Sequence, residues 1–274
     1  MRLLPTLFVA LAVPALVAAA EGEGASAGGA ERSAEGSPPA LSFAYPLFSD
    51  TPSPNTTARF DYRLTKRTAG GDALDHQLRL EGEFAPVRWL GLGAMLPYTI
   101  SDRDDTDNRY NLDDMEVELK LASFVLEEHG ILLGGGMAAE LPTGSSENEI
   151  GSDRLVWLRP FLDAGIRRGP FEATGFLRFA LPVNENGRDP DWALSWNSAF
   201  LLHAAPIAAV VFELDGERSW GGEEDGEEIV NATPGLRWSP ADDPKLWFST
   251  GIRIPVTHDD DFDLRWQISA FYHF

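Results

Sequence analysis

Alternation of apolar and polar residues is the dominant pattern of this chain. In its last segment, DFDLRWQISAFYHF, every second residue from Phe262 to Phe274 is apolar, and the residues between them are mostly polar. Because side chains of a β-strand point alternately to opposite faces, this segment predicts a strand with one apolar and one polar face. The period of two recurs in about twelve segments, without the sustained period of 3.6 that indicates a helical bundle. The pattern therefore predicts an all-β protein.

The predicted strands follow one another with turn-rich connections between them. They cover residues 58–64, 78–84, 89–98, 115–121, 131–141, 154–164, 171–181, 192–202, 207–214, 230–238, 246–254 and 262–274. The register of 207–214 stays open, because this segment is apolar on both faces until Glu213. Long, charged connections alternate with mostly shorter ones, which is typical of a meander with its loops at one end and its turns at the other.

Strand length and aromatic placement favour lipid over a protein core on the apolar face. The strands run to roughly 9–11 residues, the length that a tilted strand needs to cross a bilayer. Aromatic residues near the strand ends resemble the girdles at the two lipid interfaces: Phe84, Trp89, Tyr98, Phe171, Trp192, Trp238, Trp247, Tyr272 and Phe274. We expect a transmembrane antiparallel up-and-down β-barrel; a soluble β-sandwich that binds a ligand is the remaining alternative.

The N-terminal composition divides the chain into three parts. Arg2 precedes the apolar run LLPTLFVALAVPALV, which ends in three alanines before Glu21, as in a secretory signal peptide at 1–20. Residues 21–55 begin with a stretch of Gly, Ala, Ser, Glu and Pro and are predicted to be a flexible linker. The sequence leaves open whether LSFAYPLFSDTP within it plugs the pore. Residues 56–274 form the predicted barrel in the cell outer membrane.

The net charge and the amino-acid composition exclude some classes of binding partner. The formal net charge is −21, so the chain should repel nucleic acid, and there is no cysteine for a disulfide or a cysteine-based metal site. Acidic residues crowd into SDRDDTDN, GGEEDGEE and HDDDFD, which lack the spacing of a dedicated calcium loop and are expected to be solvated. Lipid and lipopolysaccharide are the expected surroundings, and divalent ions bridging these loops to lipopolysaccharide phosphates are a hypothesis. No metal or other cofactor is predicted.

Short motifs in the middle of the chain resemble a known family. LGLGAMLPY, LDDMEVELKLA and GMAAELPTG follow in that order, with Pro97 and Tyr98, Asp114, Leu119 and Lys120, and Leu141 to Gly144 as the matching residues. They resemble the outer-membrane transporter family of the meta-pathway of phenol degradation, over roughly 75–274. The terminal pattern closing on Phe274 also looks like the strand that the barrel-assembly machinery recognises. The resemblance implies a porin-like barrel for small, often apolar substrates.

Charged residues on the polar faces are the candidate site. We expect the following to face the lumen: Arg59, Arg63, Arg79, Glu81, Glu83, Glu116, Glu118, Lys120, Arg159, Glu172, Arg178, Arg237, Arg253 and Arg265. Rings of such charges would set the selectivity of a channel. Alternatively, they pair across strands and seal the lumen.

The predicted barrel and its inward-facing charges indicate a transport function. The chain is predicted to be an outer-membrane channel for passive or facilitated passage of a small molecule, which could be apolar or aromatic. A sealed barrel with a structural or lipid-hydrolase role is the alternative. Catalysis is not expected, because none of the five histidines sits two residues from a serine on a predicted strand.

Overall fold

The computed structural model describes residues 41–67, 73–103, 109–145, 150–152, 154–184, 191–222, 225–240, 245–257 and 262–274. The predicted signal peptide and residues 21–40 of the predicted linker lie outside the described residues, as do parts of the three acidic runs, at 104–108, 223–224 and 258–261. The divalent-ion hypothesis for those runs therefore stays a hypothesis.

The described secondary structure consists of thirteen strands and one short 3-10 helix. The strands are β1 (Thr57–Arg67), β2 (Ala73–Val87), β3 (Leu90–Arg103), β4 (Arg109–Leu112), β5 (Met115–Leu126), β6 (Ile131–Leu141), β7 (Trp157–Arg168), β8 (Phe171–Pro182), β9 (Trp192–Ala205), β10 (Ala208–Trp220), β11 (Glu228–Trp238), β12 (Leu246–Pro255) and β13 (Leu264–His273). The 3-10 helix η2 (Glu127–His129) connects β5 to β6. No described helix is long and apolar enough to span a membrane.

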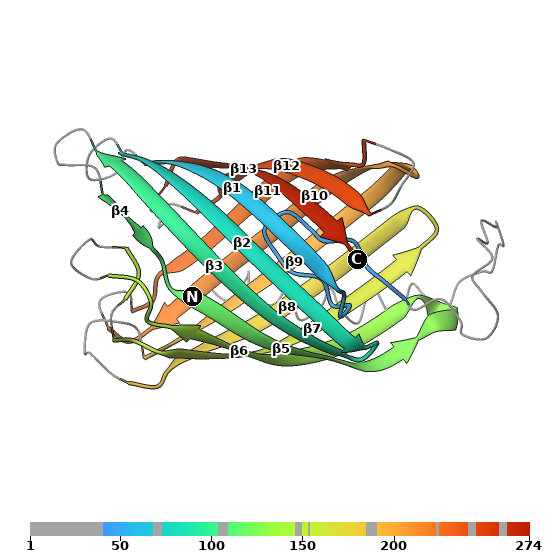
Figure 1. Ribbon diagram of the computed structural model, residues 1–274, viewed down its shortest axis with the longest axis horizontal. Helices are drawn as coiled ribbons and strands as arrows, with labels where there is room; N and C mark the ends of the chain where they lie inside the picture. Colours follow the sequence, from blue (N-terminus) through green and yellow to red (C-terminus); the bar gives the residue numbers. More distant parts are fainter. Residues whose placement is uncertain are drawn as a thin grey trace, which may run out of the picture. The chain divides into compact units, whose positions relative to one another are not determined.

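The strands close into an antiparallel barrel. β13 pairs with β1 from Thr57 opposite His273 to Lys66 opposite Leu264, and this pairing joins the last strand to the first. β4 is a short strand that pairs with β3 alone, so the other twelve of the thirteen strands form the barrel (Figure 1). Closure leaves no unpaired strand edge to meet lipid. The predicted twelve-strand barrel is therefore confirmed.

Exposure alternates along the strands as the predicted faces require. Leu80 and Phe84 on β2 are 58% and 57% exposed, whereas Lys120 on β5 and Gln267 on β13 are 1% and 0% exposed. An apolar outer surface on a closed barrel has lipid as its natural solvent, because water would make such exposure costly. The barrel thus has the outer belt of an outer-membrane barrel.

Connection lengths separate the two ends of the barrel. β2–β3, β5–β6, β7–β8, β9–β10 and β11–β12 connect at one end, where β1 begins and β13 ends. The mostly longer connections, including the one that contains β4, lie at the other end. In barrels of this kind short turns face the periplasm and longer loops face outward. We call these the short-turn end and the long-loop end.

Local boundaries and two aromatic faces differ from the sequence prediction. β4 lies in a predicted connection, and β7 begins at Trp157 rather than 154. Phe262 is 7% exposed and lies beneath Arg253 and Arg265, not on the apolar face, because the strand begins only at Leu264. Trp247 alternates with outward-facing Leu246 and lies under Arg237, so it is not part of the lipid girdle.

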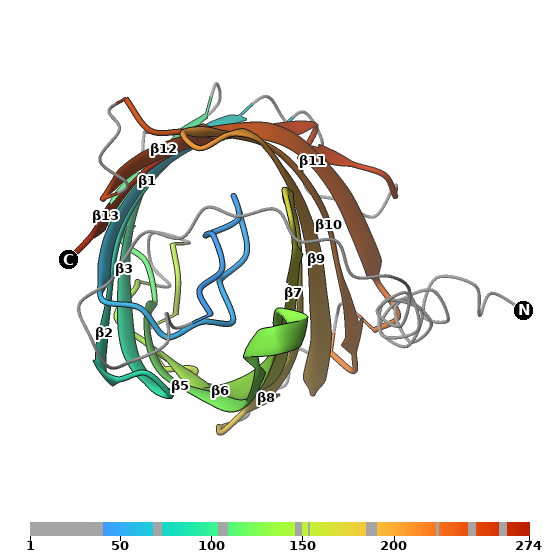
Figure 2. The same cartoon turned by 90° about the vertical axis from the view of Figure 1, so that its right-hand side faces the viewer.

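Residues 41–56, called here the N-terminal segment, lie within the ring of strands (Figure 2). Phe43, Tyr45 and Leu47 are 2%, 1% and 0% exposed. Leu47 packs against Leu201 and Val211, Phe43 against Ala122 and Leu132, and Tyr45 against Phe271, all of them inward side chains. This explains why the segment 207–214 is apolar on both faces: one face meets lipid and the other meets the N-terminal segment.

Candidate functional site

Inward side chains of the barrel form hydrogen bonds with main-chain groups of the N-terminal segment. Glu172 accepts a hydrogen bond from the Ala44 N–H, and Glu213 accepts one from the Leu47 N–H and one from the Phe48 N–H (3.1 Å). Arg237 Nη1 donates to the Tyr45 carbonyl (3.0 Å). These main-chain groups could not stay buried without such partners. Two of the charged residues predicted to face the lumen, Glu172 and Arg237, therefore bind the N-terminal segment.

Leu47 fills a socket in the barrel wall. Its side chain packs with Ala199, Leu201 and Val211. Added Cβ atoms at Gly235 and Gly251 would overlap Leu47, so the absence of side chains there makes the room. Burying a leucine contributes roughly 1.5–3 kcal/mol.

Lys120 is the centre of an ionic cluster between β5, β2 and the N-terminal segment. Its Nζ lies 2.8 Å from Asp50 Oδ2, 3.3 Å from Glu83 Oε2 and 3.5 Å from Glu118 Oε1. Tyr45 donates its hydroxyl to Glu83 Oε2 at 2.7 Å. Burial raises the pKa of Asp50, but Lys120, the Thr51 N–H group and Arg59 together lower it, so this pKa lies below its ordinary value of 3.8. The cluster ties the N-terminal segment to the barrel by charge.

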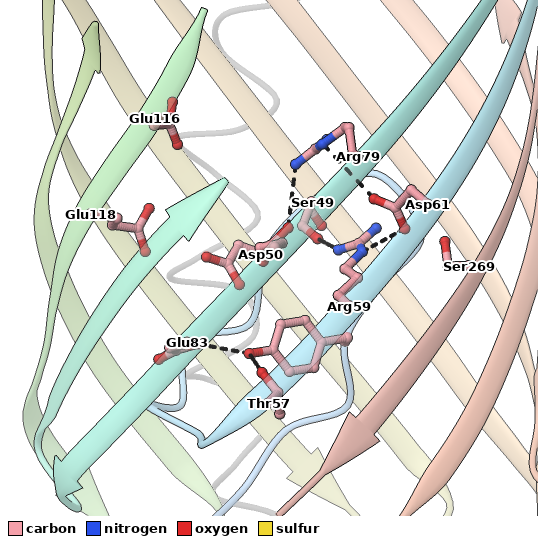
Figure 3. Close-up of polar contacts among 12 residues, drawn as sticks. Ser49, Asp50, Thr57, Arg59, Asp61, Arg79, Glu83, Glu116, Glu118 and Ser269 are labelled. Carbon is pink, nitrogen blue, oxygen red and sulfur yellow. Dashed lines mark hydrogen bonds and ion pairs between the residues drawn. The ribbon is translucent and has the colours of Figure 1, made fainter. Parts of the chain in front are cut away.

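A second network covers the wall of β1 and β2. Arg59 Nε donates to Asp61 Oδ1 at 2.7 Å (Figure 3). Arg59 also donates to the Leu47 carbonyl. Arg79 lies 3.3 Å from Glu81 and 3.9 Å from Asp61. Both arginines thus neutralise carboxylates on neighbouring positions.

A third network crosses the wall of β5 to β8. Glu116 lies 3.2 Å from Arg159 and 3.0 Å from Arg178, and Arg178 lies 3.3 Å from Glu118. The ring of Phe176 lies beneath the Arg178 guanidinium, 5.0 Å from its carbon. These contacts fix the arginines by both charge and stacking.

A cavity of about 330 Å³ lies inside the barrel, bordered by the N-terminal segment at Phe48, Ser49 and Asp50. Seven carboxylates line it: Asp50, Glu81, Glu83, Glu116, Glu118, Asp215 and Glu217. Five arginines line it: Arg59, Arg79, Arg159, Arg178 and Arg253. Among the described residues, the lining therefore has two more carboxyl groups than arginines, and Lys120 lies within 3.5 Å of three of these carboxyl groups.

The predicted site residues divide by position. Nine of them line the cavity: Arg59, Arg79, Glu81, Glu83, Glu116, Glu118, Arg159, Arg178 and Arg253. Lys120, Glu172 and Arg237 contact the N-terminal segment instead. Arg63 donates to Gln267 (2.7 Å) and Arg265 donates to Thr65 (2.9 Å), and neither lines this cavity.

Several site residues were not predicted. Asp50, Glu213 and Asp215 all bind charged or main-chain partners inside the barrel. Glu213 is the first polar residue of the segment 207–214, which is apolar on both faces. The apolar inward face of that segment indicates that another part of the chain packs against it inside the barrel.

The three motifs behind the family resemblance meet in space at the long-loop end. Asp113 N–H donates to the Pro97 carbonyl (3.0 Å), and Asp114 accepts hydrogen bonds from the main chain of Gly144 (2.9 Å) and Ser152 (2.8 Å). Thr143 Oγ1 accepts one from the Met115 N–H at 2.9 Å. The motifs therefore join β3, β5 and the connection after β6.

In the part of the chain that the structure describes, no group of three or more His, Asp or Glu residues is placed to hold a metal ion.

No family model matches the sequence, and no curated protein matches it. Solved structures do match its fold. An outer membrane channel from Pseudomonas putida F1 superposes with a TM-score of 0.65 at 11% identity, covering 88% of this chain and 100% of that one.

The chain has the fold of outer-membrane channels. The NanC porin matches with a TM-score of 0.56 at 11% identity, over 80% of this chain and 100% of that one. The translocator domain of the autotransporter NalP from Neisseria meningitidis matches at 0.52 and 9% identity, over 80% of this chain and 88% of that one. Because this fold serves more than one activity, function must be argued from the lumen.

Proposed function

We propose that this chain is an outer-membrane channel for small solutes, with the N-terminal segment as the element that controls passage. The observation that carries the proposal is the charged cavity of about 330 Å³ bordered by that segment. Fixed charges around a narrow passage select ions by their sign. The described lining has more carboxylates than arginines, so the channel should prefer cations.

The family resemblance implies small, often apolar substrates. A lumen lined by ion pairs provides few favourable contacts for a wholly apolar molecule. The socket that Leu47 fills can take an apolar group of a solute only when Leu47 leaves it. A solute with polar groups and one apolar side chain suits both parts of the lumen.

The test is conductance of the purified protein in planar bilayers, measured with a salt gradient at low ionic strength. We expect a small conductance with cation preference, which shrinks as salt screens the lining charges. A Leu47→Ala variant should conduct more, because the segment that narrows the lumen is less firmly seated. If neither protein conducts ions, the sealed barrel is favoured. Anion preference would refute the assignment of selectivity to this cavity.

A further inference from the structure

Side chains of the inner wall recognise the main chain of residues 44–48 at successive positions. Glu172 on β8 and Glu213 on β10 accept from N–H groups, while Arg237 on β11 and Arg59 on β1 donate to carbonyl groups. Main-chain groups are common to all peptides. Recognition at these positions therefore does not depend on which chain supplies them.

Sockets in the same wall select side chains. Leu47 enters the socket that Gly235 and Gly251 leave open, and Phe43 packs over Gly165. Tyr45, between them, is 1% exposed and donates to Glu83. The wall thus accepts an extended segment with large side chains at alternate positions.

Two buried charged side chains of this wall direct their hydrogen bonds to the N-terminal segment. Glu213 is 0% exposed and bonds the Leu47 and Phe48 N–H groups and the Asn197 amide. Arg237 is 4% exposed and bonds the Tyr45 carbonyl. Within the described ranges neither forms an ion pair, so both would lose buried hydrogen-bond partners if the segment left. An incoming amine or N–H group suits Glu213, and an incoming carbonyl or carboxylate suits Arg237.

From these contacts we propose that the inner wall from β7 to β12, with Arg59 of β1 and Glu83 of β2, is a binding site for short extended peptides that carry a leucine-like side chain. Residues 43–48 fill this site in cis. The proposal deepens the proposed function by naming a class of solute, and it rests on that function only for the transport of the peptide. Binding itself requires only the wall.

The experiment uses the full chain in detergent micelles and a fluorescein-labelled synthetic peptide of residues 41–50, LSFAYPLFSD. Fluorescence anisotropy reports binding to the unchanged chain and to a Leu47→Ser variant. The substitution weakens the cis segment and leaves the socket intact. A control peptide carries Asp in place of Leu47.

We expect saturable binding to Leu47→Ser with an affinity at least about tenfold higher than to the unchanged chain, since a buried leucine side chain is worth a factor of ten or more. The control peptide should bind at least about tenfold more weakly. Adding Gly251→Val, which fills the socket, should abolish binding, whereas adding Gly82→Val should not, because a Cβ at Gly82 meets open space.

Absence of saturable binding to Leu47→Ser overturns the proposal. Equal binding of the two peptides, or undiminished binding after Gly251→Val, also overturns it, since both indicate partition into the micelle. Conductance of the same preparations separates the two claims. A conducting protein that binds no peptide keeps the channel and loses the peptide site, and a silent protein that binds peptide does the reverse.

Discussion

Removing the charge of Lys120 should unseat the N-terminal segment. Lys120 is 1% exposed and compensates three carboxylates, of Asp50, Glu83 and Glu118, at 2.8, 3.3 and 3.5 Å. A Lys120→Met substitution keeps most of the side-chain length and removes the cation of Asp50 and Glu83, whereas Glu118 keeps Arg178 at 3.3 Å. Only Asp50 can leave the cluster without breaking the barrel, because it lies on the segment and the other two lie on β2 and β5.

The magnitude follows from the cost of a buried charge that loses its partner, which is about 3–5 kcal/mol. Even the lower figure corresponds to a change of about a hundredfold in the equilibrium between seated and unseated segment. The strand ladder does not involve the segment, so the barrel should keep its heat-modifiable migration on gels.

The assay is thiol labelling of a Thr51→Cys variant. The chain has no native cysteine, and Thr51 is 0% exposed, so a thiol reagent reaches this position only when the segment opens. Labelling should be about a hundredfold faster with Lys120→Met than without it. Lys66→Met on the exposed part of β1 is the matched control and should change little.

A second substitution checks the cause. Replacing Glu118 by Gln in the Lys120→Met background removes a carboxylate that repels Asp50 and should slow labelling again. The reasoning is refuted if Lys120→Met labels as slowly as the parent, or if it labels fast only because the whole barrel has unfolded.

Three further predictions concern Leu47, Asp50 and Asp114. Leu47→Ala should weaken the binding of the N-terminal segment to the barrel wall by about 2–5 kcal/mol and speed the labelling of Thr51→Cys. Leu80→Ala on the exposed outer face is the control and should not change the labelling rate. Equal effects of the two substitutions would contradict the role of the socket. Because the pKa of Asp50 is lowered, its contribution to the binding of the segment is complete above pH 3.8 and is lost as pH falls through the lowered value. An environment-sensitive dye on Thr51→Cys should therefore report opening only below pH 3.8, and an Asp50→Asn variant should lack this step. Asp114→Ala removes the hydrogen-bond acceptor for the Gly144 and Ser152 N–H groups and should lower the local stability of this loop by about 1–3 kcal/mol. Trypsin should then cleave faster at exposed Arg154 while the barrel stays intact.

The sequence by itself determined the barrel and most of its lipid-facing pattern. Strand side chains have a strict period of two, so each segment such as 171–181 reports its own faces without knowledge of its neighbours. The order of long and short connections likewise assigns the two ends. The exceptions, Phe262 and Trp247, lie where a strand begins or where an aromatic residue packs under an inward arginine.

Only the tertiary structure decided what the inner face does. Alternation identifies a residue as inward but is silent about what it meets there, because its partner lies far away in the sequence. Glu213 bonds Leu47 and Arg237 bonds Tyr45 across more than 150 residues, and no local pattern records such a pairing. The apolar LSFAYPLF and the two-faced segment 207–214 were both visible in the sequence. Their complementarity became apparent only once the barrel closed around the N-terminal segment.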